Sequence, residues 1–243
     1  MAWKNLKQRS LAESMLIEHD ALKELIVDAS VIEANQCRPN KRKDGSTTQD
    51  PDAEWHVKAG SDGKRKSTYG YKAHLSVDED GFIQRSDYSK GNLHDSHCFT
   101  GLLSGKESAV YADSAYRSEA HEAWLSSRNI KSSVIKRAYR NRPLTDEDKH
   151  FNRIHSGVRC TVERVFGVLK LHYGMAKARY LGLSRNRTRF ELMCVAHNIK
   201  RGASIQQEEL CLKNEKQRRK DVVLPESFNM KSLFGEYRQE MQN

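Results

Sequence analysis

Residues 24–32 read Glu-Leu-Ile-Val-Asp-Ala-Ser-Val-Ile, and this short stretch decides the fold of the chain. Its aliphatic and β-branched residues are typical of a buried β-strand. Asp28 interrupts the apolar run, and a buried carboxylate is costly unless it is paired or binds a metal ion. The stretch therefore predicts a core strand that carries a functional acid. The alternative is that Asp28 lies on a solvated face of that strand.

A second acid follows a second apolar run further along the chain. Residues 109–112 read Ala-Val-Tyr-Ala and are followed directly by Asp113. In open α/β sheets, functional sites gather outside the carboxyl ends of the strands. Asp113 is therefore the second candidate site residue, and the alternative is that it caps the helix that follows.

The pattern around these two runs predicts an α/β fold, a mixed sheet flanked by helices. An Asp-Glu-Asp-Gly turn at 78–81 joins two of the strands as a hairpin. The expected strands are 24–32, 68–77, 81–88, 108–112 and 130–135, and the expected helices are 94–103, 118–128, 146–173 and 189–201.

The composition divides the chain into one α/β domain at 24–202, a short amphipathic helix at 1–23 and a polar tail at 203–243. Within the domain, residues 35–67 contain almost nothing to bury except Trp55 and Val57. We therefore expect 35–67 to be a mobile polar insertion.

The helix expected after Thr145 supplies a third acid, Glu163. Successive residues of an α-helix are turned by about 100°, so four polar side chains of this helix fall on one narrow stripe. Four apolar side chains fall on an adjoining stripe. The polar stripe is His155, Arg159, Glu163 and Lys170, and the apolar stripe is Val158, Val162, Val165 and Leu169. The helix can thus pack on the sheet and aim Glu163 at Asp28 and Asp113. The alternative is a solvated Arg–Glu pair of little consequence.

Three carboxylates that converge within about 5–6 Å of a common point can hold two hard divalent cations about 4 Å apart. Such a pair of cations suits in-line phosphoryl transfer, because it stabilises both the attacking and the leaving oxygen. Nearby Lys and Arg side chains would neutralise substrate phosphates. The sequence therefore predicts a metal site formed by Asp28, Asp113 and Glu163.

The charge of the chain is concentrated near the third acid. The 243 residues contain 42 Lys and Arg against 32 Asp and Glu, and the segment 136–201 alone has 16 against 5. Such a basic segment suits a polynucleotide substrate. Within it, Arg185, Arg187 and Arg189 lie beside Tyr180 and Phe190, so we expect them to contact a DNA backbone. A merely solvated face is the alternative.

The same composition argues for a cytoplasmic protein. The chain has no apolar run long enough to span a membrane, so we expect no membrane association. Its five cysteines include no Cys-x-x-Cys pair, which points to reduced thiols rather than a disulfide framework or a zinc ribbon.

Taken together, these residues resemble the DDE transposases of bacterial insertion sequences. The resemblance covers roughly Ile26 to Arg201 and rests on an ordered set of motifs. They are Val27–Ser30, Gly70–His74, Gly91–Ser96, Tyr111–Tyr116, Asn152-Arg153, and Arg159, Glu163 and Lys170 at the family's spacing. Ser156 occupies a position where the family has Tyr, and His155 is the residue that could replace it.

The resemblance implies an RNase H-like catalytic domain that cuts and joins transposon DNA with two Mg²⁺ ions, for which Mn²⁺ can substitute. Asp28 would bridge both ions, and Asp113 and Glu163 would each hold one. Arg159 and Lys170 would contact the backbone of the transposon end, and His155 is expected to contact the DNA beside them. The partners implied are double-stranded DNA, as transposon ends and target, and a second copy of the chain in a homodimer on paired ends. No role is implied for Asn92, His94 and Asp95.

One departure from the family concerns the N-terminal side. Only 27 residues precede Asp28, where these proteins usually carry a helical DNA-binding region. We therefore expect the second reading frame of a two-frame element, or a truncated copy that lacks end recognition. Two alternatives to the transposase stay open: a metal-dependent nuclease without strand transfer, and a remnant that binds DNA without catalysis.

Overall fold

The computed structural model describes residues 23–35, 50–59, 63–139 and 142–221. Almost all of the helix expected at 1–23, residues 36–49 of the expected insertion, and the end of the expected tail lie outside these residues. The chain divides into two compact units, Met1–Arg201 and Gly202–Asn243. In the second unit, residues 202–221 continue a helix.

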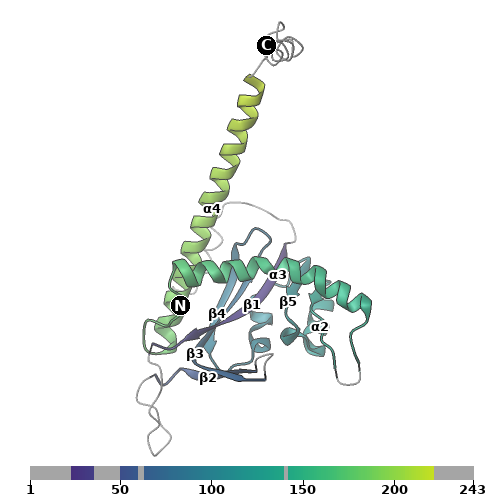
Figure 1. The fold of residues 1–243 in the computed structure, drawn as a ribbon, viewed down its shortest axis with the longest axis vertical. Helices are drawn as coiled ribbons and strands as arrows, with labels where there is room; N and C mark the ends of the chain where they lie inside the picture. Colours follow the sequence, from purple (N-terminus) through teal and green to yellow (C-terminus); the bar gives the residue numbers. More distant parts are fainter. Residues whose placement is uncertain (1–22, 36–49, 60–62, 140–141, 222–243) are drawn as a thin grey trace, which may run out of the picture. The chain divides into compact units, whose positions relative to one another are not determined.

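The first unit is built on a mixed sheet, as expected from the sequence, and its described residues form six strands where five were expected (Figure 1). They are β1 (Glu24–Glu33), β2 (Glu54–Ala59), β3 (Arg65–Val77), β4 (Ile83–Lys90), β5 (Ala109–Ala112) and β6 (Lys131–Val134). The main path through the sheet runs β2-β3-β1-β5-β6, and β4 pairs with β3. β1, β3 and β4 form an antiparallel meander, whereas β5 and β6 are parallel to β1.

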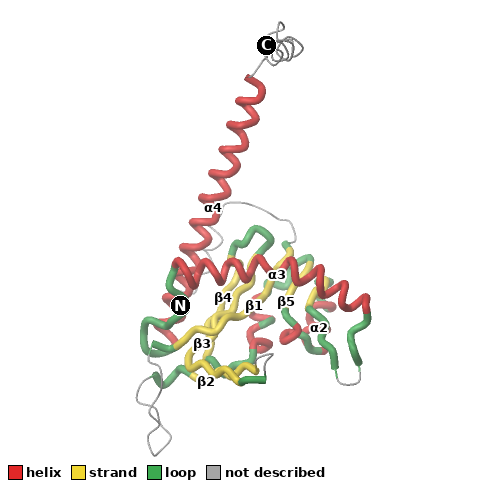
Figure 2. Tube along the Cα trace, in the orientation of Figure 1, coloured by secondary structure: helices red, strands yellow, loops and turns green. Residues whose placement is uncertain are grey.

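Helices cover both faces of this sheet (Figure 2). Successive side chains of a strand point to opposite faces, so Ile26 and Val27 of β1 enter two different cores. On the side of Ile26 lie α3 (Asp146–His172) and the first part of α4 (Leu183–Asp221). On the side of Val27 lie α2 (Glu119–Ser126) and the short 3₁₀ helices η1 (Asp95–Cys98), η2 (Thr100–Leu102) and η3 (Ser114–Tyr116).

Three expectations need correction. Residues 54–59 are not a polar insertion, because they form β2 against an extended β3 that begins at Arg65. The single helix expected at 94–103 is two 3₁₀ helices, η1 and η2. The last helix is much longer than the expected 189–201, because α4 begins at Leu183 and continues to Asp221. Among the described residues, no helix combines the length and the apolar character that a membrane crossing requires.

Candidate active site

The first two acids are neighbours because of the strand register. The parallel ladder of β1 and β5 ends with Val27 opposite Ala112, so Asp28 and Asp113 are the next residues on two adjacent strands. Adjacent strands lie about 4.8 Å apart. Asp28 shares its face of β1 with Ile26, the face that α3 covers. Asp113 also caps η3, since its Oδ1 accepts a hydrogen bond of 2.6 Å from the N–H of Ser114.

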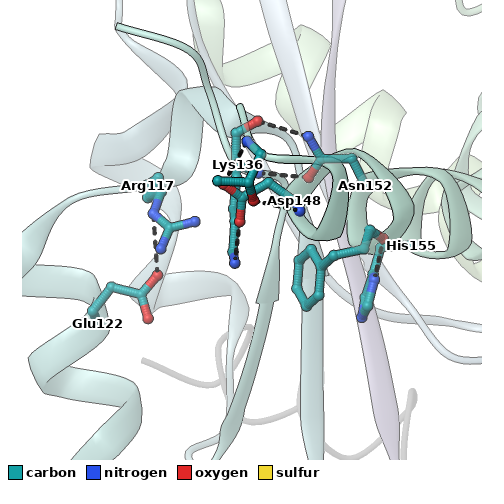
Figure 3. A network of polar contacts seen from close by, with 8 residues as sticks. Arg117, Glu122, Lys136, Asp148, Asn152 and His155 are labelled. Carbon is teal, nitrogen blue, oxygen red and sulfur yellow. Dashed lines mark hydrogen bonds and ion pairs between the residues drawn. The ribbon is translucent and has the colours of Figure 1, made fainter. Parts of the chain in front are cut away.

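The N-terminal part of α3 is fastened to the segment that follows β6 (Figure 3). Thr145 and Asp148 form a reciprocal capping box at the start of the helix. The Asn152 amide then clamps the backbone of Lys136, accepting from its N–H at 2.9 Å and donating to its carbonyl at 2.8 Å. Lys136 Nζ also lies 2.6 Å from Asp148 Oδ1. These contacts fix where α3 begins and therefore how it crosses the sheet.

Further along α3, the two predicted stripes separate as expected. The buried side chains are Val162, Val165, Phe166 and Leu169, and Val158 packs against the same core. These side chains fix the rotation of the helix about its axis. Arg159, Glu163 and Lys170 consequently border a cleft rather than the core.

This cleft, of about 830 Å³, follows β1 beyond the end of β5. At its far end the backbone of the segment after α3 pairs with Glu33, whose N–H donates to Ala176 and whose carbonyl accepts from Ala178. The cleft therefore lies along the part of β1 between Asp28 and Glu33. Its charged and titratable lining residues are Asp28, Glu33, His56, Lys58, Lys66, Lys72, Asp95, Asp113, Arg159, Glu163, Lys170 and Lys177.

Arg159 connects the two aspartates. Its guanidinium lies 3.5 Å from a carboxylate oxygen of Asp28 and 3.9 Å from one of Asp113. The side chain of Arg159 is 13% exposed, and its Nε has no hydrogen-bond partner among the described residues. Burial raises the pKa of Asp28; the Arg159 charge and the Ala29 N–H oppose this, while Asp113 and Glu163 reinforce it. The three acids thus interact electrostatically, with a cation held between two of them.

The donor chemistry of the three acids suits a hard divalent cation, because all of their ligand atoms are carboxylate oxygens. As the side chains stand, however, the described residues include no three His, Cys, Asp or Glu side chains close enough to hold one metal ion. The expected convergence on a common point is therefore not present in this arrangement. The guanidinium of Arg159 supplies the positive charge between Asp28 and Asp113 instead.

Four residues predicted to contact DNA lie outside the cleft lining. His155 Nδ1 is hydrogen-bonded at 2.6 Å to the Phe151 carbonyl of its own helix, and its ring stacks on Phe151. Arg187 donates to the Tyr88 carbonyl and pairs with Asp87 of β4. Arg185 and Arg189 line a separate groove beside α4.

In that groove, Arg189 is already engaged with the protein. It donates to the carbonyl oxygens of Tyr173, Gly174 and Lys177, where α3 ends and the following segment turns back towards α4. Arg187 and Arg189 therefore anchor α4 whatever else they contact, whereas Arg185 is exposed on that helix.

Several cleft residues were not predicted as site residues. Lys72 is buried, and its Nζ lies 2.9 Å from Asp95 Oδ1 and 2.7 Å from the Leu93 carbonyl. This pair gives a role to the 91–96 motif, in which His94 caps η1 and Asp95 neutralises Lys72. A lysine within the apolar run of residues 69–77 was the signal that could have indicated the pair. Lys58, Lys66 and Lys177 carried no comparable signal.

Two aspartates on adjacent parallel strands, with a glutamate on a helix across the same sheet, are consistent with the RNase H-like class of catalytic domain. Comparison with known proteins agrees with this class. The model of the family described as "Transposase DDE domain" matches residues 21–199, and the chain belongs to this family. The chain is also 29% identical over 191 residues to the transposase for insertion sequence element IS1106 of Neisseria meningitidis serogroup B. The match covers 74% of this chain and 65% of the length of that relative.

Proposed function

We propose that this chain is the catalytic part of an insertion-sequence transposase that cleaves and joins double-stranded DNA through Asp28, Asp113 and Glu163. The observation that carries the proposal is the shared cleft: three carboxylates from β1, from the end of β5 and from α3 border it together with Arg159 and Lys170. Membership of the DDE family and the likeness to a named transposase support the same reading.

In this proposal Asp28, Asp113 and Glu163 hold Mg²⁺, for which Mn²⁺ can substitute. When bound, the metal lowers the pKa of an attacking water and stabilises the charge that develops on the transferred phosphate. Asp28 would be shared between the ions, since its carboxylate interacts electrostatically with both Asp113 and Glu163. Lys170 places a positive charge on the cleft, where it can bind a phosphate next to the reacting one.

Arg159 has two roles in the proposal. Without DNA and metal, its guanidinium balances the charges of Asp28 and Asp113. A cation held by these acids would compete with the guanidinium for them, and the planar donor fork of Arg159 would then suit a phosphate of the substrate. A homodimer on paired ends belongs to the same proposal, with the family resemblance as its support.

The test uses labelled duplex DNA that carries the ends of the element encoding the chain. With Mg²⁺, the wild-type protein should release the ends and join them to target DNA, and Glu163→Gln should lose both reactions by several orders of magnitude. Glu147→Gln is the matched control, because Glu147 is an exposed acid in the first turn of the same helix. It should behave as the wild type.

Each other outcome identifies an alternative. Cleavage without joined product would identify a nuclease that lacks strand transfer. If the wild type and Glu163→Gln both bind DNA and neither cleaves it, the chain is a non-catalytic DNA-binding protein and the proposal is refuted.

A further inference from the structure

A second group of charges in the cleft lies on β2 and β3. Lys58 and Lys66 are directly opposite each other in the antiparallel ladder, and both are exposed. Like charges directly opposite each other destabilise a strand pair. Both side chains line the cleft, whereas the neighbouring Arg65 does not. A pair of this kind, in a cleft, suits an anionic ligand that removes the repulsion.

Two further lysines extend this group along the cleft. Lys177 is held beside the end of β1 by the backbone pairing of Glu33 with the segment after α3. Lys170 comes from the last turn of α3. Two parts of the chain that are distant in sequence, the β2–β3 pair and α3 with the segment after it, thus bring lysines to the same cleft. We call Lys58, Lys66 and Lys177 the distal lysines.

The surroundings of the distal lysines are electropositive. His56 lies on the same face of β2 as Lys58 and also lines the cleft. Burial lowers the pKa of His56, the charges of Lys72 and Lys58 lower it further, and Asp95 and a hydrogen bond with the backbone of Gly91 oppose them. Burial is the largest cause of this lowering, and the charges of Lys72 and Lys58 act in the same direction.

The spacing along β1 fits a nucleic-acid strand. From Asp28 to Glu33 the strand advances five residues, or about 17 Å at the usual rise. A B-form DNA strand has one phosphate per about 3.4 Å of helix axis, so the same distance corresponds to about five phosphates. A strand whose reacting phosphate lies at Asp28 would therefore reach the distal lysines a few nucleotides away.

We propose that the distal lysines bind the phosphodiester backbone of duplex DNA at phosphates a few nucleotides from the reacting bond. This inference rests on the proposed function for the position of the DNA. The contact is electrostatic and independent of base sequence, because lysine ammonium groups approach phosphates as point charges. In this arrangement the β2–β3 ladder binds the DNA away from the reacting phosphate.

The test is the salt dependence of DNA binding by the full chain. Binding of a fluorescent duplex is measured by anisotropy over a range of salt concentrations without divalent cations. Each lost phosphate contact should reduce the slope of log K against log salt by about 0.9, so the double variant Lys58→Ala/Lys66→Ala should lose about 1.8. Arg65→Ala is the matched control, since Arg65 is an exposed cation of the same strand that does not line the cleft. Its slope should equal that of the wild type.

An unchanged slope in the double variant, with circular dichroism that matches the wild type, overturns the inference, and so does an equal loss in Arg65→Ala. If the double variant fails to fold, the single variant Lys177→Ala tests the distal lysines instead, because Lys177 lies outside the β2–β3 ladder. Its slope should fall by about 0.9. Failure of the proposed function is distinguishable. In that case the slope still falls in the lysine variants, but no Mg²⁺-dependent cleavage sensitive to Glu163→Gln is found.

Discussion

The guanidinium of Arg159 lies 3.5 Å from the carboxylate of Asp28 and reaches Asp113 on the neighbouring strand at 3.9 Å. A protein cation thus stands where the proposed function requires a metal ion. It offsets the repulsion between two neighbouring carboxylates, of which Asp28 is largely buried and Asp113 about half exposed.

The first prediction is that Arg159→Gln strengthens divalent-cation binding. Without the guanidinium, Asp28 and Asp113 have no competing positive charge between them, so Mg²⁺ should bind more tightly. A ligand that binds only the folded state raises the free energy of unfolding, and at a given ligand concentration the rise is larger when the ligand binds more tightly. The Tm rise caused by millimolar Mg²⁺, measured by differential scanning fluorimetry, should therefore be larger in the variant than in the wild type.

Two controls accompany this measurement. Lys149→Gln removes a cation of the same helix that pairs with the exposed Asp146, and its Mg²⁺ response should equal that of the wild type. Asp28→Asn should abolish the response. An equal Tm rise in Arg159→Gln and the wild type would show that Arg159 does not occupy the cation's position.

The second prediction concerns Gly70, where β3 pairs with both β1 and β2. A Cβ at Gly70 would lie inside van der Waals contact with the carbonyl oxygen of Ile32 and 2.8 Å from the backbone nitrogen of Ala34. Both obstacles are backbone atoms of the neighbouring segment and cannot rotate away. Gly70→Ala should therefore lower the free energy of unfolding by at least about 1–3 kcal/mol, the usual cost of overpacking.

Gly157→Ala is the matched control for this effect. Gly157 lies within α3, and a Cβ there would have no atom within 4 Å outside its own helix. Alanine should stabilise the helix by roughly 0.5–1 kcal/mol. Urea denaturation should thus show a lower free energy of unfolding for Gly70→Ala and a higher one for Gly157→Ala. An unchanged free energy of unfolding in Gly70→Ala would show that the strands can separate at this point.

The contrast between β1 and β2 shows what the sequence could predict. β1 and Asp28 were predictable because an acid within a strongly apolar run is visible locally, and Glu163 because helical periodicity places it beside an apolar stripe. β2 has no such signal, since Trp55 is 39% exposed and Val57 56% exposed. It exists through pairing with β3, including the contact of Trp55 with its ladder partner Tyr69, whose ring centroids lie 5.2 Å apart. β2 and the first residues of β3 both fall within 35–67, the segment that was expected to be a mobile polar insertion.

The distal lysines of the cleft could not be predicted from the sequence for the same reason. Lys58, Lys66 and Lys177 are ordinary surface lysines in the sequence, and only the register of β2 with β3 and the return of the chain after α3 bring them together. The extension of α4 was missed for a related reason. Its residues after Arg201 are mostly polar, so they lack the apolar period from which a helix is predicted.

The last prediction is a loss of stability in mild acid that depends on His197. This side chain is 7% exposed, and its ring Nε2 lies 3.1 Å from the carbonyl oxygen of Gly81. Burial lowers its pKa, the Gly81 carbonyl opposes this, and Arg201 and Lys200 add to the lowering. The folded protein therefore keeps His197 neutral at a pH where the unfolded chain, with the ordinary pKa of 6.5, takes up a proton.

Because the unfolded state binds more protons below that pH, the free energy of unfolding should fall as the pH drops below 6.5, by at most about 1.4 kcal/mol per pH unit for one proton. His74, fully buried with its pKa also lowered by burial, contributes a second fall of the same sign. In His197→Gln the amide can still donate to Gly81 but cannot titrate. Urea denaturation at a series of pH values should thus give a shallower slope below pH 6.5 than the wild type, with the remaining slope due to His74 and the acids. Identical slopes in the two proteins would mean that folding does not lower the pKa of His197.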